Sequence, residues 1–120
     1  MDDKPKVPRS YGAFLREFPK LGDAWEAMRE AEENGPYGRR ELRLLKLAIA
    51  IGTQKEGPVH SGVRKALAAG CSAKEIRHLV ALAASTIGLP PAVAVWSWID
   101  EELEKSSAAA EKPGKGSRPA

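Results

Sequence analysis

The sequence of 120 residues contains only one cysteine, Cys71. A single cysteine cannot form a disulfide within the chain, and it cannot supply a two-cysteine metal site or redox pair. The sequence also has no apolar run near the roughly 18 residues that a membrane-spanning helix requires. Its first residues, "MDDKPKVPRS", lack the apolar segment of a secretory signal. These absences predict a cytoplasmic protein that has no membrane partner.

An excess of one charge is also missing from most of the chain. The net charge is +3, from 19 basic and 16 acidic side chains. The segment 105–120 holds Lys105, Lys112, Lys115 and Arg118 against Glu111. Residues 1–104 therefore hold 15 side chains of each sign and are neutral. Because the excess lies in the tail, we expect no nucleic-acid-binding surface on the fold and no nucleic-acid partner.

Apolar residues recur at helical spacing, and no segment shows the alternation of a strand. The sequence therefore predicts an all-α fold of five or six helices with short connections. We expect a flexible N-terminal arm at residues 1–9, a helical domain at residues 10–104, and a disordered basic tail at residues 105–120. The expected helices lie at about residues 10–18, 20–34, 38–52, 58–69, 73–87 and 91–104.

Three of these helices have distinctive features. The segment "GRRELRLLKLAIAIG" is apolar on nearly all sides, which is typical of a helix at the centre of a domain or an oligomer. Ser72 and Glu75 form the pattern of a capping box at the start of the fifth helix. In the last helix we expect Trp96 to face inward. Trp96 and Trp98 cannot both face one core, so we expect one of them at a subunit contact.

Four segments, taken in their order, make the chain similar to a known family. They are "RELRLLKLAIAIG", a short helix start, "VRKALAAGCSAKEIRHLVALA" and "TIGLPPAVAVWSWID". The span from Glu41 to Ile99 resembles the carboxymuconolactone decarboxylase family, which includes the alkylhydroperoxidase D-like proteins. The resemblance implies an all-helical bundle and an obligate homo-oligomer, usually a trimer or hexamer. It also implies an oxidoreductase with peroxiredoxin-type activity.

The functional residues of the peroxidase branch do not transfer to this chain. The resemblance implies two cysteines separated by two residues, a histidine four positions later, and a glutamate on the preceding helix. Aligned without gaps, these positions hold Lys55, Pro58, Gly62 and Arg43, with Glu41 two residues from the last. A peroxidatic thiol must ionise, and a second thiol must resolve its sulfenic acid. We therefore expect a branch without the two-cysteine motif and without thiol peroxidase chemistry.

His60, in "QKEGPVHSGVRKAL", is the remaining candidate in this stretch. With Gly57 as the N-cap and Pro58 as the first helical residue, His60 would lie in the first turn. The positive end of the helix dipole there disfavours imidazolium, and a neutral imidazole can act as a general base. His60 cannot simply replace a histidine at position 62, because two residues along a helix turn the side chain by about 200°.

Three functions stay open at this point. In the first, the chain keeps the peroxiredoxin-type activity of the family. In the second, His60 acts with Glu56 or Glu41 in a cofactor-free lyase or isomerase, and Arg43 binds the anion of a small carboxylated or lactone substrate. In the third, His60 only packs at the helix start, and the oligomer is a non-catalytic scaffold that binds a small anionic ligand. Glu56 and His60 are too few ligands to predict a metal, so we expect no metal and no cofactor.

The other candidates have simpler interpretations. We expect Cys71 to be buried and unreactive in the turn between two helices. We expect His78 on the polar side of its helix, in solvent. Arg43 and Lys46 lie on an otherwise apolar helix and favour salt bridges at a subunit interface.

Overall fold

The structure is a computed structural model that describes residues 9–110. The ends of the expected arm and tail, residues 1–8 and 111–120, lie outside the described residues. Every described element is a helix, so the all-α prediction is confirmed. The helices are α1 (Arg9–Glu17), α2 (Pro19–Glu33), α3 (Arg39–Thr53), α4 (Glu56–Ala68), α5 (Ala73–Ile87) and α6 (Leu89–Ala110).

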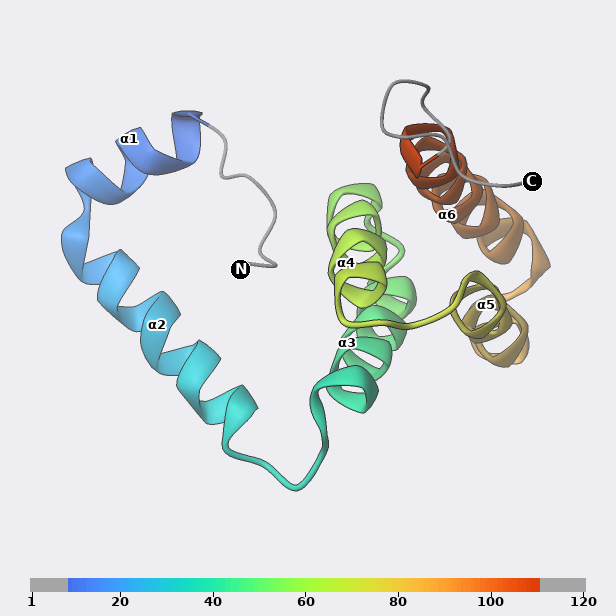
Figure 1. The fold of residues 1–120 in the computed structure, drawn as a ribbon, viewed down its shortest axis with the longest axis horizontal. Coiled ribbons are helices and arrows are strands. Elements are labelled where there is room, and N and C mark those ends of the chain that lie inside the picture. The colour runs from blue at the N-terminus through green and yellow to red at the C-terminus, as the bar shows by residue number, and fades with distance from the viewer. Residues whose placement is uncertain (1–8, 111–120) are drawn as a thin grey trace.

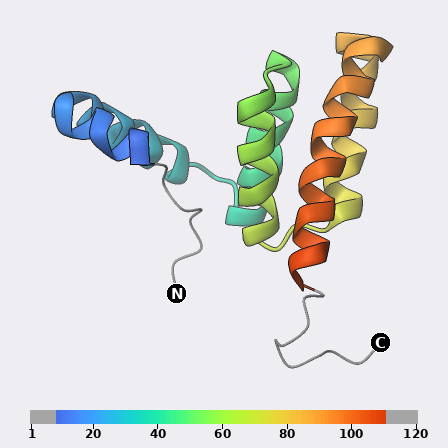
Figure 2. The same ribbon diagram turned by 90° about the horizontal axis from the view of Figure 1, so that it is seen from above.

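Helices α3 to α6 form the bundle that contains the core. Two hairpins, α3 with α4 and α5 with α6, stand side by side (Figures 1 and 2). Their inward faces supply one apolar cluster, and short links between consecutive helices keep neighbours antiparallel. The buried residues of the cluster are Leu47, Ile51, Val59, Val63, Ala66, Cys71, Ile76, Val80, Ala92, Val95, Ile99 and Leu103.

Helices α1 and α2 form a third helix pair, the α1–α2 hairpin, which extends to one side of the bundle (Figures 1 and 2). Neither helix has a buried residue. Lys46 of α3 and Glu32 of α2 form an ion pair of 2.6 Å between the hairpin and the bundle. Large apolar side chains are about half exposed along the hairpin, at Phe14, Phe18, Leu21, Trp25 and Met28. The hairpin therefore presents apolar surface that the protomer itself leaves open.

Helix α4 begins at Glu56, two residues before the expected start at Pro58. Lys55 is the N-cap, with an extended backbone (φ −102°, ψ 128°), so the prediction of Gly57 as the cap was wrong. Pro58 is tolerated as the third helical residue because the first four N–H groups of a helix have no partner within it. His60 therefore lies in the second turn rather than the first. The helix dipole, which falls off within the first turn, has less influence there.

Helix α6 is longer than expected at both ends. It begins at Leu89, so Pro90 and Pro91 occupy its second and third positions, where an N–H is again not needed. It continues to Ala110, so residues 105–110 are helical, although we expected them in a disordered tail. Three consecutive alanines at 108–110 favour this extension, because alanine has the highest helix propensity.

The expectations for α3, α5 and α6 are met in part. Ser72 and Glu75 form both hydrogen bonds of the capping box, which confirms that prediction. Helix α3 buries Leu47 completely but leaves Ile49 66% exposed, so it is central on one face only. Trp96 was expected to face the core, but it is 42% exposed under the guanidinium of Arg77. Trp98 packs against the core instead. Within residues 9–110, no helix combines the length and the apolar character needed to cross a membrane.

Candidate functional site

His60 lies between two carboxylates from different helices. Its Nδ1 is 2.7 Å from Oε2 of Glu102 on α6, and its Nε2 is 3.1 Å from Oε2 of Glu56. Glu56 lies one turn before His60, and the early start of α4 places both side chains on one helix face. The imidazole is 15% exposed, so it is largely shielded from water. The structure thus brings together the two residues whose relative geometry the sequence left open.

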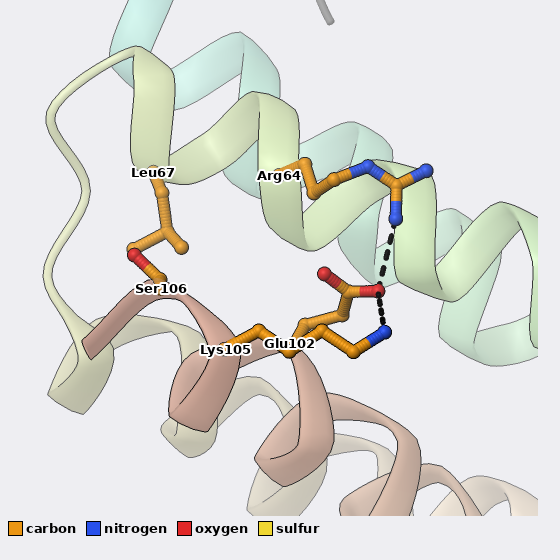
Figure 3. Close-up of a pocket in the computed structure, with 5 residues that line it drawn as sticks. All are labelled: Arg64, Leu67, Glu102, Lys105 and Ser106. Carbon is orange, nitrogen blue, oxygen red and sulfur yellow. Dashed lines mark hydrogen bonds and ion pairs between the residues drawn. The ribbon is translucent and has the colours of Figure 1, made fainter. Parts of the chain in front are cut away.

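Glu102 is the residue that the sequence analysis missed. Its side chain is only 6% exposed, and its Oε2 also accepts a hydrogen bond of 2.9 Å from Nη1 of Arg64. Lys105 adds a second positive charge, with Nζ 3.8 Å from the same oxygen (Figure 3). A buried carboxylate is costly unless it is paired, and here Arg64 and Lys105 compensate the charge while His60 adds a hydrogen bond.

A signal for Glu102 was present in the sequence. Val95, Ile99 and Leu103 form the core stripe of α6, and Glu102 lies seven residues after Val95 and three after Ile99. Helical spacing therefore places this carboxylate on the apolar face. A charged residue on a buried stripe needs a specific partner, and His60 and Arg64 supply it.

The hydrogen-bond geometry constrains the proton on His60. A neutral imidazole has one N–H, so only one ring nitrogen donates. The contact to buried Glu102 is the shorter, at 2.7 Å. For the neutral ring we therefore assign the proton to Nδ1, and Nε2, 3.1 Å from Oε2 of Glu56, then faces that carboxylate with its lone pair and makes no hydrogen bond to it. Oε1 of Glu101 lies 4.0 Å from the same Nε2.

An open hollow adjoins Glu102, on the side of this carboxylate that Arg64 and Lys105 approach; His60 is not among the residues that line it. It has a volume of about 440 Å³ and is lined by Arg64, Leu67, Glu102, Lys105 and Ser106. In Figure 3 the side chains of Arg64 and Lys105 approach the Glu102 carboxylate from opposite sides. Arg64 and Lys105 are 48% and 64% exposed, which leaves N–H groups available to a small anion.

The structure does not bring Glu41 to His60. Glu41 lies in the first turn of α3, and α3 and α4 are antiparallel. The end of α3 is next to the start of α4, about 18 Å along the helix from Glu41. Glu41 instead lies near Cys71, where its charge is one of the influences that raise the thiol's pKa.

Arg43 lies close enough to Lys65 for its charge to act on that side chain. Burial lowers the pKa of Lys65, and the nearby charges of Arg43 and Lys46 lower it further. Arg43 therefore belongs to a basic group on α3 and α4 that the hairpin's Glu32 partly balances. Lys46 forms its ion pair within the chain.

Cys71 has the properties of a structural thiol. It is 5% exposed, and its Sγ lies 3.6 Å from the carbonyl oxygen of Arg40, to which it donates. Burial is the main cause that raises the pKa of the Cys71 thiol above its ordinary value. A peroxidatic cysteine needs the opposite shift, because the thiolate is the nucleophile. His78, on the outer side of α5, is exposed.

Gly62 allows α3 and α4 to approach closely. A Cβ at this position would lie 2.9 Å from Cδ1 and 3.5 Å from Cα of Leu47. Leu47 is fully buried, so it has little room to move. The place at which the resemblance implies a histidine is therefore a helix–helix contact in this chain, and His60 lies on a different face.

Comparison with known proteins gives one match. The family model described as "Carboxymuconolactone decarboxylase family" matches residues 19–101, more than half of the chain. Neither the curated proteins nor the solved structures gave a match. The matched residues run from α2 into α6 and include Glu56, His60 and Glu101. Glu102 follows directly after the match.

Proposed function

Since the chain belongs to the carboxymuconolactone decarboxylase family, we propose that it is an acid–base enzyme of that family. In this proposal His60 moves a proton on a small carboxylated or lactone substrate, as a lyase or isomerase. The observation that supports it is the 2.7 Å hydrogen bond between His60 and the buried carboxylate of Glu102. A histidine oriented in this way by a carboxylate is a common general base.

The chemistry follows from the two ring nitrogens. The Nδ1–H group donates a hydrogen bond to Glu102, so the ring is held in one orientation and Nε2 keeps its lone pair. Nε2 takes a proton from a carbon or hydroxyl of the substrate, and the negative charge stays on the substrate as an enolate or alkoxide. The imidazolium that forms is stabilised by Glu102. The same proton then returns to the substrate at another atom, which completes an isomerisation.

Substrate binding is assigned to the hollow beside the pair. Arg64 and Lys105 line it, and a guanidinium can hold a carboxylate through two parallel hydrogen bonds. Glu56 is 57% exposed, so its side chain can turn away from Nε2 when a substrate enters. Because His60 does not line this hollow, the preferred ligand is an anion long enough to extend from Arg64 past Glu102 to Nε2, with an acidic C–H or O–H group at that end.

Thiol peroxidase activity has weaker support. The chain has one cysteine, which is buried and has a raised pKa, and Lys55 and Pro58 stand where the family motif has its cysteines. We propose that the chain does not reduce peroxides with a dithiol donor.

We also propose a homo-oligomer, a trimer or hexamer as the family resemblance implies, that works in the cytoplasm. The support is the apolar surface of the α1–α2 hairpin, where Trp25 and Met28 are 48% and 54% exposed. Large exposed apolar patches mark interaction sites.

The test is a proton-exchange assay in D₂O with a panel of small carboxylated carbon acids and lactones, followed by NMR. We expect exchange at one substrate position, and His60→Ala should reduce its rate by about 10²–10⁴-fold. His78→Ala is the matched control and should leave the rate unchanged. If no panel member exchanges, or if His60→Ala is as active as the parent, the proposal is wrong.

A further inference from the structure

Three possible ligand atoms converge at the outer edge of the His60 ring. They are Nε2 of His60, one carboxylate oxygen of Glu56 and one of Glu101, and all lie within 4.8 Å of one another. Two helices supply them, since Glu101 belongs to α6 and the others to α4. The geometry points to a binding site for one divalent cation of the Zn²⁺ type. This inference does not rest on the proposed proton transfer.

The distances fit such an ion after small side-chain rotations. With Zn–ligand bonds of about 2.0–2.1 Å, the ligand atoms of a tetrahedral site lie roughly 3.3 Å apart. Nε2 is 3.1 Å from Glu56 Oε2 and 4.0 Å from Glu101 Oε1, values on either side of that separation. Glu56 and Glu101 are 57% and 55% exposed, so both carboxylates have room to adjust.

The buried carboxylate behind the ring is an independent sign of a cation ligand. Histidines that bind metals usually donate their other N–H to a carboxylate or carbonyl, which fixes the tautomer and the ring plane. Glu102, 6% exposed, makes this contact with Nδ1 at 2.7 Å. With the proton on Nδ1, three electron-rich atoms face one another across the Nε2 edge, and a cation at their centre would satisfy them all.

The local charge also favours a cation. Glu56, Glu101 and Glu102 supply three negative charges, and among residues 9–110 the lysine and arginine side chains within 4.0 Å of them are Arg64 and Lys105. A neutral His60 leaves this group with a net negative charge. Three protein ligands leave a fourth position open to water or to a substrate oxygen.

The cation and the proposed proton transfer use the same lone pair of Nε2. A bound Zn²⁺ would therefore stop His60 from acting as a base, and binding can be measured without any substrate. The two proposals fail separately, because the proton-exchange assay is run with a chelator and the binding assay contains only the metal.

The test is calorimetric titration of the full, tag-free chain with ZnCl₂. We expect one ion per chain, and His60→Ala should weaken binding by at least about 100-fold. Glu56→Gln and Glu101→Gln, both exposed, should each weaken it by about tenfold. The matched controls are Glu104→Gln on α6 and His78→Ala on α5, which should bind as the parent does. Circular dichroism confirms that each variant is folded.

A substitution of Lys105 should strengthen Zn²⁺ binding, whereas the ligand variants should weaken it. Its Nζ lies 4.0 Å from Glu101 and 3.8 Å from Glu102, so it competes with a cation for these carboxylates. Lys105→Met should therefore strengthen Zn²⁺ binding by a factor of about two to five. The inference is overturned if the parent binds no Zn²⁺, if His60→Ala binds it equally well, or if Glu104→Gln weakens binding as much as Glu101→Gln does.

Discussion

The α3–α6 bundle and the α1–α2 hairpin use the same helical spacing of apolar residues with opposite results. In the bundle, Leu47 and Ile51, four residues apart, are fully buried. In the hairpin, Leu21, Trp25 and Met28 have equivalent spacing, yet each is about half exposed. The difference teaches that periodicity identifies the residues that share a helix face, but not the surface that covers that face.

The largest expected effect contrasts the two apolar faces. Leu47→Ala should lower the free energy of unfolding by about 2–5 kcal/mol, because it leaves a cavity in the core. Trp25→Ala should cost about 1 kcal/mol or less in the protomer, but it should weaken self-association. Chemical denaturation measures the first quantity and light scattering the second. Equal losses of unfolding free energy in both variants would contradict the contrast.

The next largest effect is expected at one of two glycines that lie at close helix–helix contacts. A Cβ at Gly62 would lie 2.9 Å from the fully buried Leu47, whereas a Cβ at Gly22 would lie 3.3 Å from the Leu15 side chain in the hairpin. We expect Gly62→Ala to lower the unfolding free energy by about 1–3 kcal/mol through overpacking. Gly22→Ala should be near neutral, since Leu15 can move and alanine favours the helix. Thermal melts compare them, and a neutral Gly62→Ala would show that α3 and α4 do not approach so closely.

A third comparison uses a carboxylate from each region. Glu102 is 6% exposed in the bundle, whereas Glu26 of the hairpin is 59% exposed and lies 3.5 Å from Arg29. Glu102→Gln should lower the unfolding free energy by about 1–3 kcal/mol, the range for a buried hydrogen bond to a charged group. Glu26→Gln should change it by less than about 0.5 kcal/mol. Urea titrations of both variants measure these two changes in unfolding free energy. An unchanged unfolding free energy in Glu102→Gln would argue against a paired, buried carboxylate.

The smallest expected effect is the pH dependence of stability that the capping box at the start of α5 provides. Helix α5 has the Ser72–Glu75 capping box, whereas the N-cap of α2, Phe18, makes no side-chain capping bond. The hydrogen bond from the Ser72 backbone, and then Arg40, hold the pKa of Glu75 below its ordinary value of 4.5. A lowered pKa in the folded state means stability that is present above pH 4.5 and is lost as the pH falls through the folded-state pKa.

The Glu75→Gln variant should therefore be less stable than the parent at neutral pH. Its melting temperature should also fall less than the parent's as the pH drops below 4.5. Melting temperatures between pH 3 and pH 7 measure this, with Glu26→Gln as the control that keeps the parent's slope. A parent-like acid slope in Glu75→Gln would contradict the role of the capping box.

Local signals predicted most of the fold. Apolar spacing predicted five or six helices, and the Ser72–Glu75 pattern predicted the start of α5. The starts of α4 and α6 were misplaced for one reason. Proline is accepted at the second or third helical position as well as at the first, so Pro58 and Pro91 do not fix the first residue.

The candidate site was predicted only in part. Glu56 and His60 are four residues apart, so a local rule relates them once the helix start is known. Glu102 is 42 residues from His60, and only the packing of α6 on α4 brings the two side chains together. Glu41 was chosen because it is two residues from the aligned glutamate position, and Arg43 because it is a positive charge on an otherwise apolar helix. Both lie near the start of α3, far from the start of the antiparallel α4 where His60 lies.

The most direct test of the account is the tautomer of His60, measured by ¹H–¹⁵N NMR of the imidazole nitrogens at a pH where the ring is neutral. The chain has only two histidines, so His60→Ala assigns the signals and exposed His78 serves as the internal reference. The account predicts that His60 has its proton on Nδ1, held by Glu102, and an unprotonated Nε2. A His60 ring with its proton on Nε2, as in free histidine, would contradict both the proposed base and the proposed cation ligand.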